Sequence, residues 1–390
     1  MKAIKVKIYP KDKQKVLIEK HFGCCRFVYN LGLEKKTKAY TEKKESLSVY
    51  QIQKDVPKLK EEKPWIGEVN AQSLQQSLVD LESAFSHFFK KNNDYPQFKS
   101  KYNSKQSFRV PQSFQIARDK KAIKLPKLKW IKFRDKFNVP KDVEFRNITI
   151  SREGNEYFAS ICYDDKIPKP ETKPITSNET LGIDLGIKKL AIFSNGDKID
   201  NPKHFNKYEH KLAKEQQRFS KITNKELKSY KKQKEKVRKI HQKIRNTRKD
   251  FLHKLTTGLV KNQDYTSYAM EDLAVKEMEQ ENFTPMSKAI GDAGWRMLRD
   301  MMKYKCEDRG KNLLVIGRFE PSSKTCSVCG SIYRELERDE EDWTCAKCNT
   351  YHDRDVNAAI NIKNFGIIKS LGKDFSEASE SEPNLEPHDL

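Results

Sequence analysis

Hydrophobic and polar positions alternate in several short stretches of the first 170 residues. In residues 4–8, isoleucine or valine alternates with lysine as far as Pro10, which predicts a short edge strand. The same period of two returns after residue 107 and predicts further strands in three segments, 108–117, 122–133 and a hairpin-like 145–163. Short strands at this spacing are typical of a small barrel or sandwich, which residues 4–9 would join.

A helical period interrupts these strands. Residues 13–44 and 70–91 repeat their hydrophobic positions every three or four residues, and Asn70 is placed to cap the second helix. The buried stripe of that helix would consist of five large side chains: Leu74, Leu78, Leu81, Phe85 and Phe88. These helices are therefore predicted to be inserted between strands of an N-terminal domain.

The pattern changes after residues 167–180, a stretch with three prolines that is typical of a linker. Beyond it, two or three strands are predicted in residues 181–199, followed by a long helical segment, 203–262, that divides near residue 223. A strand, a helix and another strand are predicted at 267–270, 294–309 and 312–316. From about residue 372 the chain is acidic and poor in apolar residues, which predicts a disordered tail.

The chain of 390 residues is long enough for two or three domains, and it is strongly basic, with a formal net charge of +23. Such an excess is typical of proteins that bind a polyanion, most often nucleic acid. Lysine and arginine are concentrated in 203–262, where one face could line a phosphate backbone or could simply be solvated. No apolar run reaches the length of a membrane span, and residues 1–7 alternate like a strand, so we expect a cytosolic protein.

Asp184 lies in the most informative stretch of the chain. Around it, leucine and isoleucine alternate with Gly182, Asp184 and Gly186. In a strand, this period places one carboxylate on a face between two residues that lack side chains. A buried carboxylate needs a partner, and the glycines leave room beside it for a hydrated metal ion with a phosphate.

Two later stretches offer further acids. Glu271 follows the predicted strand 267–270, at a point where side chains leave a sheet, although Asp272 could equally be the functional acid. Asp353 is placed to cap a helix that begins after it. Asp355 shares a face of that helix with small alanines, which would let this face approach a sheet closely. The alternative for Asp355 is that it only complements the helix dipole.

Carboxylates from one strand, a second strand end and a helix can together hold two Mg²⁺ ions about 4 Å apart. This arrangement aligns an attacking water and stabilises the leaving oxygen in phosphodiester hydrolysis. Hard oxygen ligands favour Mg²⁺ or Mn²⁺ over zinc. The acids Asp184, Glu271 and Asp355 are thus candidates for such a site.

Two Cys-x-x-Cys pairs are separated by fifteen residues: Cys326 with Cys329, and Cys345 with Cys348. Four thiolates at this spacing match a closed tetrahedral zinc site, which would be structural because no position is open. Two disulfides are the alternative, and a cytosolic chain disfavours them. The remaining cysteines have apolar neighbours and are predicted core residues: Cys24, Cys25, Cys162 and Cys306.

Together these motifs resemble those of the transposon-encoded TnpB family, relatives of the type V CRISPR effectors. The resemblance extends over residues 1–370 and is most specific in the C-terminal half, while the N-terminal half matches mainly in layout, including residues 96–101. It rests on Leu-Gly-Ile-Asp184-Leu-Gly, Met-Glu271-Asp-Leu, the Ser322-Ser323 segment, the two cysteine pairs and His-Asp-Arg-Asp355-Val-Asn-Ala-Ala.

The resemblance implies an α+β multidomain protein. Its N-terminal part would be a wedge β-barrel with a helical recognition insertion, and its C-terminal part a split RuvC-like nuclease domain of the ribonuclease H-like α/β fold with a zinc-ribbon insertion. The implied boundaries are 1–10 and 100–170 for the barrel, 11–99 for the recognition insertion, 171–320 and 351–370 for the nuclease, 321–350 for the zinc-binding insertion and 371–390 for the acidic disordered tail.

The resemblance also implies an RNA-guided DNA endonuclease. Such proteins bind a guide RNA from the transposon end and cut complementary double-stranded DNA beside a short transposon-associated motif, so base pairing supplies the sequence choice. Asp184, Glu271 and Asp355 would be its catalytic acids and hold two Mg²⁺ or Mn²⁺ ions, and the four cysteines would hold one structural Zn²⁺. We expect a monomeric protein within a ribonucleoprotein, in the prokaryotic cytoplasm at the nucleoid.

The residues that read the DNA motif cannot be transferred from the family. Four side chains are candidates because amide and guanidinium groups can contact base edges, although each could be an ordinary surface residue: Gln72, Gln76, Arg109 and Gln112.

Two other functions fit the same residues. One is a ribonuclease H-like transposase that performs strand transfer with the three acids. The other is a zinc-containing nucleic-acid-binding repressor that does not cut. Copurified RNA and guide-directed cleavage would favour the endonuclease over both.

Overall fold

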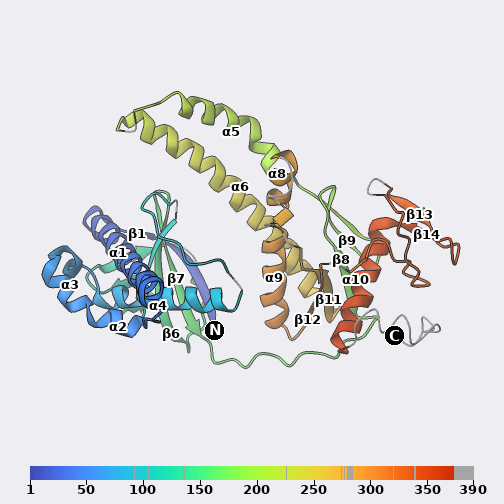
Figure 1. Ribbon diagram of the computed structural model, residues 1–390, viewed down its shortest axis with the longest axis horizontal. Coiled ribbons are helices and arrows are strands. Elements are labelled where there is room, and N and C mark those ends of the chain that lie inside the picture. Colours follow the sequence, from blue (N-terminus) through green and yellow to red (C-terminus); the bar gives the residue numbers. More distant parts are fainter. Residues whose placement is uncertain are drawn as a thin grey trace. The chain divides into compact units, whose positions relative to one another are not determined.

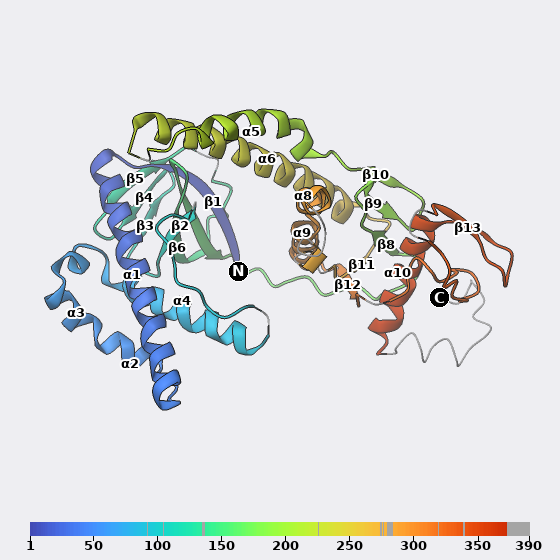
Figure 2. The ribbon, with the colours of Figure 1, turned by 45° about the horizontal axis from the view of Figure 1, so that its top comes forward.

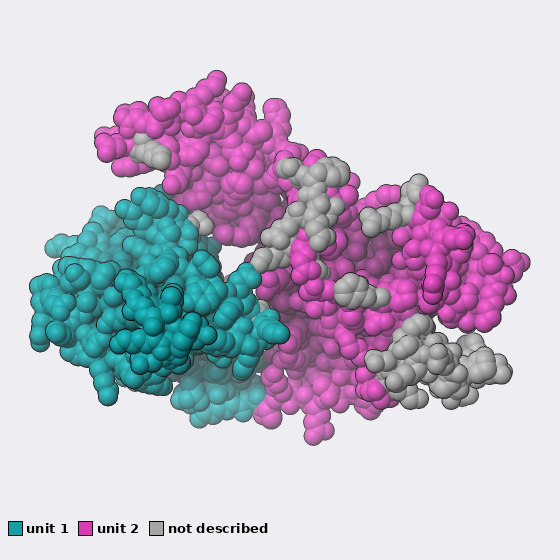
Figure 3. Space-filling view, viewed as in Figure 1, with its two compact units in different colours: residues 1–167 teal, residues 168–390 magenta. Residues whose placement is uncertain are grey.

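The computed structural model describes residues 1–372 apart from 92, 104, 135–136, 225, 274, 276, 279–283, 319 and 338–339. The acidic tail predicted for 371–390 therefore lies almost wholly outside the described residues. The chain divides into two compact units, Met1–Ile167 and Pro168–Leu390, which are coloured separately in Figure 3.

Unit 1 is built on a seven-stranded antiparallel sheet. Its strands are β1 (Lys2–Tyr9), β2 (Lys105–Val110), β3 (Gln115–Ala117), β4 (Ala122–Leu125), β5 (Lys129–Phe133), β6 (Glu144–Glu153) and β7 (Glu156–Asp164). They follow the order β2-β6-β7-β1-β5-β4-β3. The strands predicted by the period of two are thus confirmed, including the hairpin between β6 and β7, while closure into a barrel stays a prediction.

The position of β1 corrects the sequence prediction, because the strand is central and not at an edge. It pairs with β7 along most of its length and with β5 at its end. Val6 and Ile8 are buried on one face. On the other face, Lys5 and Lys7 form ion pairs with Glu153 and Glu156. These pairs come from residues about 150 positions away, so the local alternation of lysines could not reveal them.

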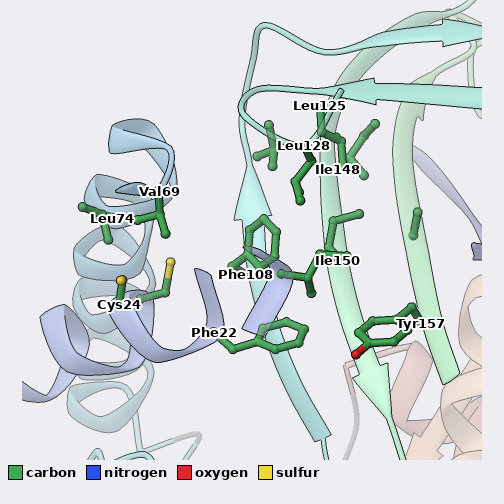
Figure 4. Packing of buried hydrophobic residues seen from close by; sticks show 14 of the residues in the cluster. Phe22, Cys24, Val69, Leu74, Phe108, Leu125, Leu128, Ile148, Ile150 and Tyr157 are labelled. Carbon is green, nitrogen blue, oxygen red and sulfur yellow. The ribbon is translucent and has the colours of Figure 1, made fainter. Parts of the chain in front are cut away.

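The helices of unit 1 pack on this sheet. α1 (Asp12–Lys43) and α4 (Ala71–Phe89) match the predicted segments, and the Asn70 side chain accepts a hydrogen bond from the Gln72 backbone N–H as the predicted cap. Three elements between them lacked a clear period and were not predicted: α2 (Val49–Lys54), α3 (Val56–Glu62) and a 3₁₀ turn at Pro64–Glu68. Figure 4 shows Phe22 beside Phe108, and Leu74 near Cys24, in the core that joins helices and sheet.

Unit 2 contains a mixed five-stranded sheet in the order β10-β9-β8-β11-β12. The strands are β8 (Thr180–Asp184), β9 (Lys189–Phe193), β10 (Lys198–Asp200), β11 (Ser267–Glu271) and β12 (Asn312–Ile316). β8, β11 and β12 run parallel, and β9 and β10 extend the sheet as antiparallel strands. These strands confirm the segments predicted from the sequence.

The described helices of unit 2 are α5 (His204–Ser220), α6 (Lys228–Lys261), α8 (Thr284–Ala293), α9 (Trp295–Glu307) and α10 (Arg354–Ser370). The predicted division of the basic segment near residue 223 is confirmed, and α5 and α6 run side by side as a hairpin (Figures 1 and 2). A separate two-stranded sheet, β13 (Asp342–Thr344) and β14 (Tyr351–Asp353), precedes α10. None of the helices in the described ranges is both long and apolar enough to cross a membrane.

The two faces of the unit 2 sheet carry different helices. Leu181 and Ile183 of β8 lie in one core with residues of α6 and α9. The opposite face packs against α10, where Ala269 shares a core with Ile362 and Phe365. Because side chains alternate along a strand, Gly182 faces α10 as well. By the same alternation, Asp184 at the end of β8 lies on the face that α10 covers.

Gly182 is required by the close approach of α10 to β8. A Cβ atom at this position would lie 1.9 Å from the carbonyl oxygen of Ala359 and 3.0 Å from the Cβ of Lys363. Ala358 and Ala359 are themselves buried. Small residues on both elements therefore allow the helix backbone to rest on the strand.

We expect Gly182→Ala to destabilise unit 2 by about 3 kcal/mol, because the new methyl group overlaps a backbone atom that cannot turn aside. Gly258→Ala is the matched control, since its Cβ would meet nothing within 4 Å in the middle of α6 and should add up to about 1 kcal/mol. Urea unfolding of both variants measures the difference. Equal stability of the two variants would contradict the close packing.

Candidate catalytic and metal sites

Asp184 and Glu271 emerge side by side from neighbouring parallel strands. The register pairs Ala269 with Gly182 and Met270 with Ile183, so Glu271 and Asp184 are the next residues on each strand. Residues at equal register in parallel strands point to the same face of the sheet, and the strands lie about 4.8 Å apart. Both carboxylates therefore leave the sheet on the face that α10 covers.

Asp355 arrives from the first turn of α10. It precedes Ala359 by one helical turn, about 6 Å, and Asp184 follows Gly182 by two strand residues, about 6.6 Å. Asp355 and Asp184 therefore lie at similar distances from the contact between Gly182 and Ala359, one along the helix and the other along the strand. Asp355 is exposed, whereas Asp184 and Glu271 are partly buried. The three predicted acids converge at one accessible edge of the sheet.

Asp353 has the capping role that the sequence predicts. Its Oδ1 accepts hydrogen bonds from the backbone N–H groups of Asp355 at 3.1 Å and Val356 at 3.0 Å. A cap of this kind fixes where the helix begins. Asp353 therefore orients the first turn that carries Asp355, and its own carboxylate also pairs with Lys198.

The carboxylates of this site repel one another. Burial, followed by the charges of Glu271 and Asp355, raises the pKa of Asp184 to about 7. Burial also raises the pKa of Glu271, although a hydrogen bond from Ser322 opposes the change. Desolvation and the charge of Asp353 raise the pKa of Asp355. A divalent cation would relieve this repulsion, and carboxylate oxygens are the ligands that Mg²⁺ and Mn²⁺ prefer, so the residues fit such an ion.

Glu271, and not Asp272, belongs to this cluster. The carboxylate of Asp272 forms an ion pair with Arg299 of α9. Glu271 instead raises the pKa of Asp184 and accepts a hydrogen bond from the Ser322 hydroxyl. Arg299, which lies 27 residues away in the sequence, thus pairs with Asp272, the acid that the family resemblance does not favour.

The four predicted cysteines form a compact cluster of free thiols. Their sulfur atoms all lie within 4.8 Å of one another. Among the described residues, these four cysteines form the group of His, Cys, Asp or Glu side chains that is compact enough to hold a metal ion. The three carboxylates are more loosely arranged. The Sγ atoms of Cys326 and Cys348, and those of Cys329 and Cys345, are 3.6 Å apart. Tetrahedral zinc with bonds of about 2.3 Å places its sulfurs at nearly this spacing, whereas a disulfide needs about 2.05 Å. The cluster therefore could bind zinc.

Three polar residues near these sites had no role predicted from the sequence, although Ser322 and Asn357 lie within the motifs that carry the family resemblance. Ser322 donates a hydrogen bond to the Glu271 carboxylate at 2.8 Å. Asn357 and Asn361 of α10 are buried and bind the backbone of the loop that carries the first cysteine pair. Two asparagines four residues apart in an apolar helix face are a signal that sequence reasoning could have used, because buried amides need partners.

The four candidates for reading a DNA motif lie in unit 1 and come together only in part. Gln76 donates a hydrogen bond to Asp80 at 3.2 Å, and Arg109 forms an ion pair with the same carboxylate at 3.5 Å. Gln72 is partly buried on the same helix, and Gln112 is exposed beyond the end of β2. Asp80 therefore links two of the four.

Models of three families match this chain. The OrfB_IS605 model, described as "Probable transposase", matches residues 160–282. The TNB domain of Cas12f1-like proteins matches residues 295–362, and a helix-turn-helix domain model matches residues 1–45. The first two matches cover the segments that contribute Asp184, Glu271, Asp355 and the cysteines.

Relatives align along almost the whole chain. A protein of Streptomyces pristinaespiralis named "Putative RNA-guided DNA endonuclease" is 36% identical over 95% of this chain and 90% of its own length. A protein of Escherichia coli K12 named "Putative RNA-guided DNA endonuclease InsQ" is 30% identical over 93% and 91%. The fold is similar to that of a Cas12f1 chain in a complex with sgRNA and target DNA, with a TM-score of 0.56, 15% identity and coverage of 93% of this chain and 98% of that one.

Asp184→Asn should stabilise the protein at pH 8 in buffer without Mg²⁺ or Mn²⁺, by roughly 2 kcal/mol. Asp184 has a folded pKa of about 7 against 3.8, so the folded state favours its neutral form. The resulting stabilisation is present at pH 4 and is lost as the pH rises through 7, whereas asparagine stays neutral. Thermal unfolding from pH 5 to 8 should show a gain that grows with pH. Asp300→Asn, at an exposed carboxylate of α9, is the control, and parallel pH curves for Asp184→Asn and the unaltered protein would refute the prediction.

The purified protein should carry one zinc ion per chain. Cys329→Ser should lose most of this zinc and lower the unfolding temperature of unit 2, because a structural zinc contributes its binding energy to folding. Cys162→Ser, at a thiol of β7 in unit 1, should keep the zinc. Elemental analysis measures the content, and an unchanged value in Cys329→Ser would contradict the site.

Proposed function

This chain belongs to the transposon-encoded TnpB family, and from that membership we propose that it is an RNA-guided DNA endonuclease. Two relatives named as such endonucleases align over at least nine tenths of its length. The single observation that carries the proposal is the convergence of Asp184, Glu271 and Asp355, where burial and the charges of the other two acids raise the pKa of Asp184. The chain's large positive charge fits a protein that works on nucleic acid.

The three acids would act as ligands of two divalent cations at the scissile phosphate. When bound, Mg²⁺ or Mn²⁺ would polarise the phosphodiester and lower the pKa of the attacking water. Asp184 and Glu271 would hold the ions from partly buried positions, and Asp355 from an exposed one. Ser322 would orient the Glu271 carboxylate, and Asp353 would orient the turn that carries Asp355. The accessible edge near Asp355 would admit the DNA strand.

Nucleic-acid binding would be shared between the two units. In unit 2 the basic hairpin of α5 and α6 would contact phosphates, and base pairing between a guide RNA and the target strand would supply sequence choice. In unit 1 we assign residues 1–10 and 100–170 to a wedge domain and 11–99 to a recognition insertion. Gln72, Gln76, Arg109 and Gln112 are our candidates for contacts with a DNA motif beside the target.

The nuclease and zinc-binding parts follow from the same family. We assign residues 171–320 and 351–370 to a split RuvC-like domain and 321–350 to a zinc-binding insertion, in a protein that acts as a monomer within a ribonucleoprotein in the bacterial cytoplasm. A transposase is the second candidate, because the OrfB_IS605 model that matches residues 160–282 is described as a probable transposase.

Asp184→Ala should lower the rate of guide-directed cleavage of double-stranded DNA by about a thousandfold or more, equal to roughly 4 kcal/mol of lost transition-state stabilisation. The RNA that copurifies with the unaltered protein is sequenced first, and a target complementary to its variable end is then cut in the presence of Mg²⁺. The variant should still bind this RNA and DNA, because the charge that holds them lies elsewhere.

The outcomes separate the candidates. Joining of transposon ends without RNA would favour the transposase. Binding without any cleavage by the unaltered protein would favour a repressor. Cleavage by Asp184→Ala at the normal rate would contradict the proposed catalytic role of the carboxylates.

A further inference from the structure

Two buried asparagines of α10 bind the loop of residues 322–327, which leads into the first cysteine pair. The Asn361 Nδ2 donates to the carbonyl oxygens of Ser322 at 2.7 Å and Thr325 at 2.6 Å. The Asn357 Nδ2 donates to the Thr325 carbonyl at 2.7 Å, and its Oδ1 accepts from the Ser327 N–H at 2.9 Å. Both side chains are 2% exposed. Four hydrogen bonds, three of them fully buried, thus fix residues 322–327 to one face of the helix.

The loop held in this way connects the two candidate metal sites. Its first residue is Ser322, whose hydroxyl donates to the Glu271 carboxylate at 2.8 Å. Near its other end is Cys326, whose sulfur belongs to the thiol cluster. Only three residues separate a cysteine of one site from the hydrogen-bond donor of the other. A displacement of the cysteine would therefore be transmitted to Glu271.

The cysteine cluster also contacts the other side of the carboxylate site. His352 Nε2 lies 3.1 Å from Cys326 Sγ, and its ring packs against Trp343 with ring centroids 4.7 Å apart. The next residue, Asp353, caps α10 and so orients the turn with Asp355. The cluster is thus connected to two of the three acids, from opposite ends of the insertion.

These contacts are strong enough to transmit a change of position. A buried hydrogen bond contributes about 1 kcal/mol, and leaving a buried amide or carbonyl unpaired costs about 1–3 kcal/mol. The loop therefore cannot shift on α10 without losing several of these bonds. Among the described residues of the insertion, few large apolar side chains, Tyr333, Leu336 and Trp343, pack with the cysteines, so its order depends on what the thiols bind.

We propose that Asn357, Asn361 and Ser322 are positioning residues that couple the cysteine cluster to the carboxylate site, so that zinc bound by the thiols sets the place of Glu271 and Asp355. This inference rests on the proposed nuclease function only for its activity readout. The binding of Mn²⁺ by the carboxylates tests it without any cleavage. The competing explanation is that the three residues contribute to stability alone.

Ser322→Ala tests the coupling most sharply, because it removes one hydroxyl and keeps the backbone carbonyl that Asn361 binds. We expect unchanged zinc content and unfolding temperature, Mn²⁺ affinity of the protein reduced about ten- to hundredfold, and cleavage at limiting Mg²⁺ reduced in parallel. High Mg²⁺ should restore much of the rate, and Ser322→Thr, which keeps a hydroxyl, should restore both readouts. Ser323→Ala is the matched control and should behave like the unaltered protein.

Zinc depletion tests the other half of the coupling. Protein that is stripped of zinc by a chelator and then dialysed should bind Mn²⁺ more weakly, and added zinc should restore the affinity. Asn361→Leu should accelerate hydrogen exchange in residues 322–327 and weaken Mn²⁺ binding, whereas Asn364→Leu, at a partly exposed position of α10, should do neither.

The proposal is overturned if Ser322→Ala, or the zinc-depleted protein, binds Mn²⁺ as tightly as the loaded unaltered protein. It is also overturned if Ser322→Ala loses zinc and stability together with its Mn²⁺ affinity, since the residue would then act on stability alone. If the unaltered protein binds Mn²⁺ but never cuts guided DNA, the proposed function fails while the coupling is still decided by affinity.

Discussion

The close approach of α10 to β8 is the contact on which the unit 2 site depends. The two backbones meet where Gly182 has no side chain and where α10 presents Ala358 and Ala359. Every side chain larger than hydrogen at Gly182 would push the helix away, and Asp355 would move with it. The absence of a single methyl group at Gly182 therefore determines whether Asp355 can approach Asp184, which lies about 170 residues earlier in the chain.

This convergence has an energetic cost. Burial raises the pKa of each of the three carboxylates at this edge of the sheet, and the charges of Glu271 and Asp355 raise the pKa of Asp184 further. Such a cluster is less stable than three separated acids, so its presence is better explained by a bound cation than by the needs of the fold. The close packing of α10 must be firm enough to hold the acids together against their repulsion.

Sequence reasoning succeeded where the cause is local. Periods of two and 3.6, the cap at Asn70, the cap at Asp353 and the spacing of the cysteines are all contained within short stretches, and the structure has each of them. It failed where the cause is distant. The central place of β1 depends on β5 and β7. The local pattern alone also left Glu271 and Asp272 open, and only the family resemblance favoured Glu271, because the ion-pair partner of Asp272 is the distant Arg299. Neither partner lies within a sequence window that shows a pattern.

The cysteine cluster lies directly before the helix turn that carries Asp355, and this position has a physical reason. The last acid must be placed to within a fraction of an ångström, yet it lies in the first turn of a helix, where a helix is least well fixed by its own hydrogen bonds. A cysteine cluster directly before this turn supplies the missing constraint, because His352 contacts Cys326 and Asp353 begins the helix. Thiolates select zinc while carboxylates select magnesium, so one ion can order the turn without competing for the place of the other. The insertion is therefore most useful at the position where it occurs, beside the start of α10.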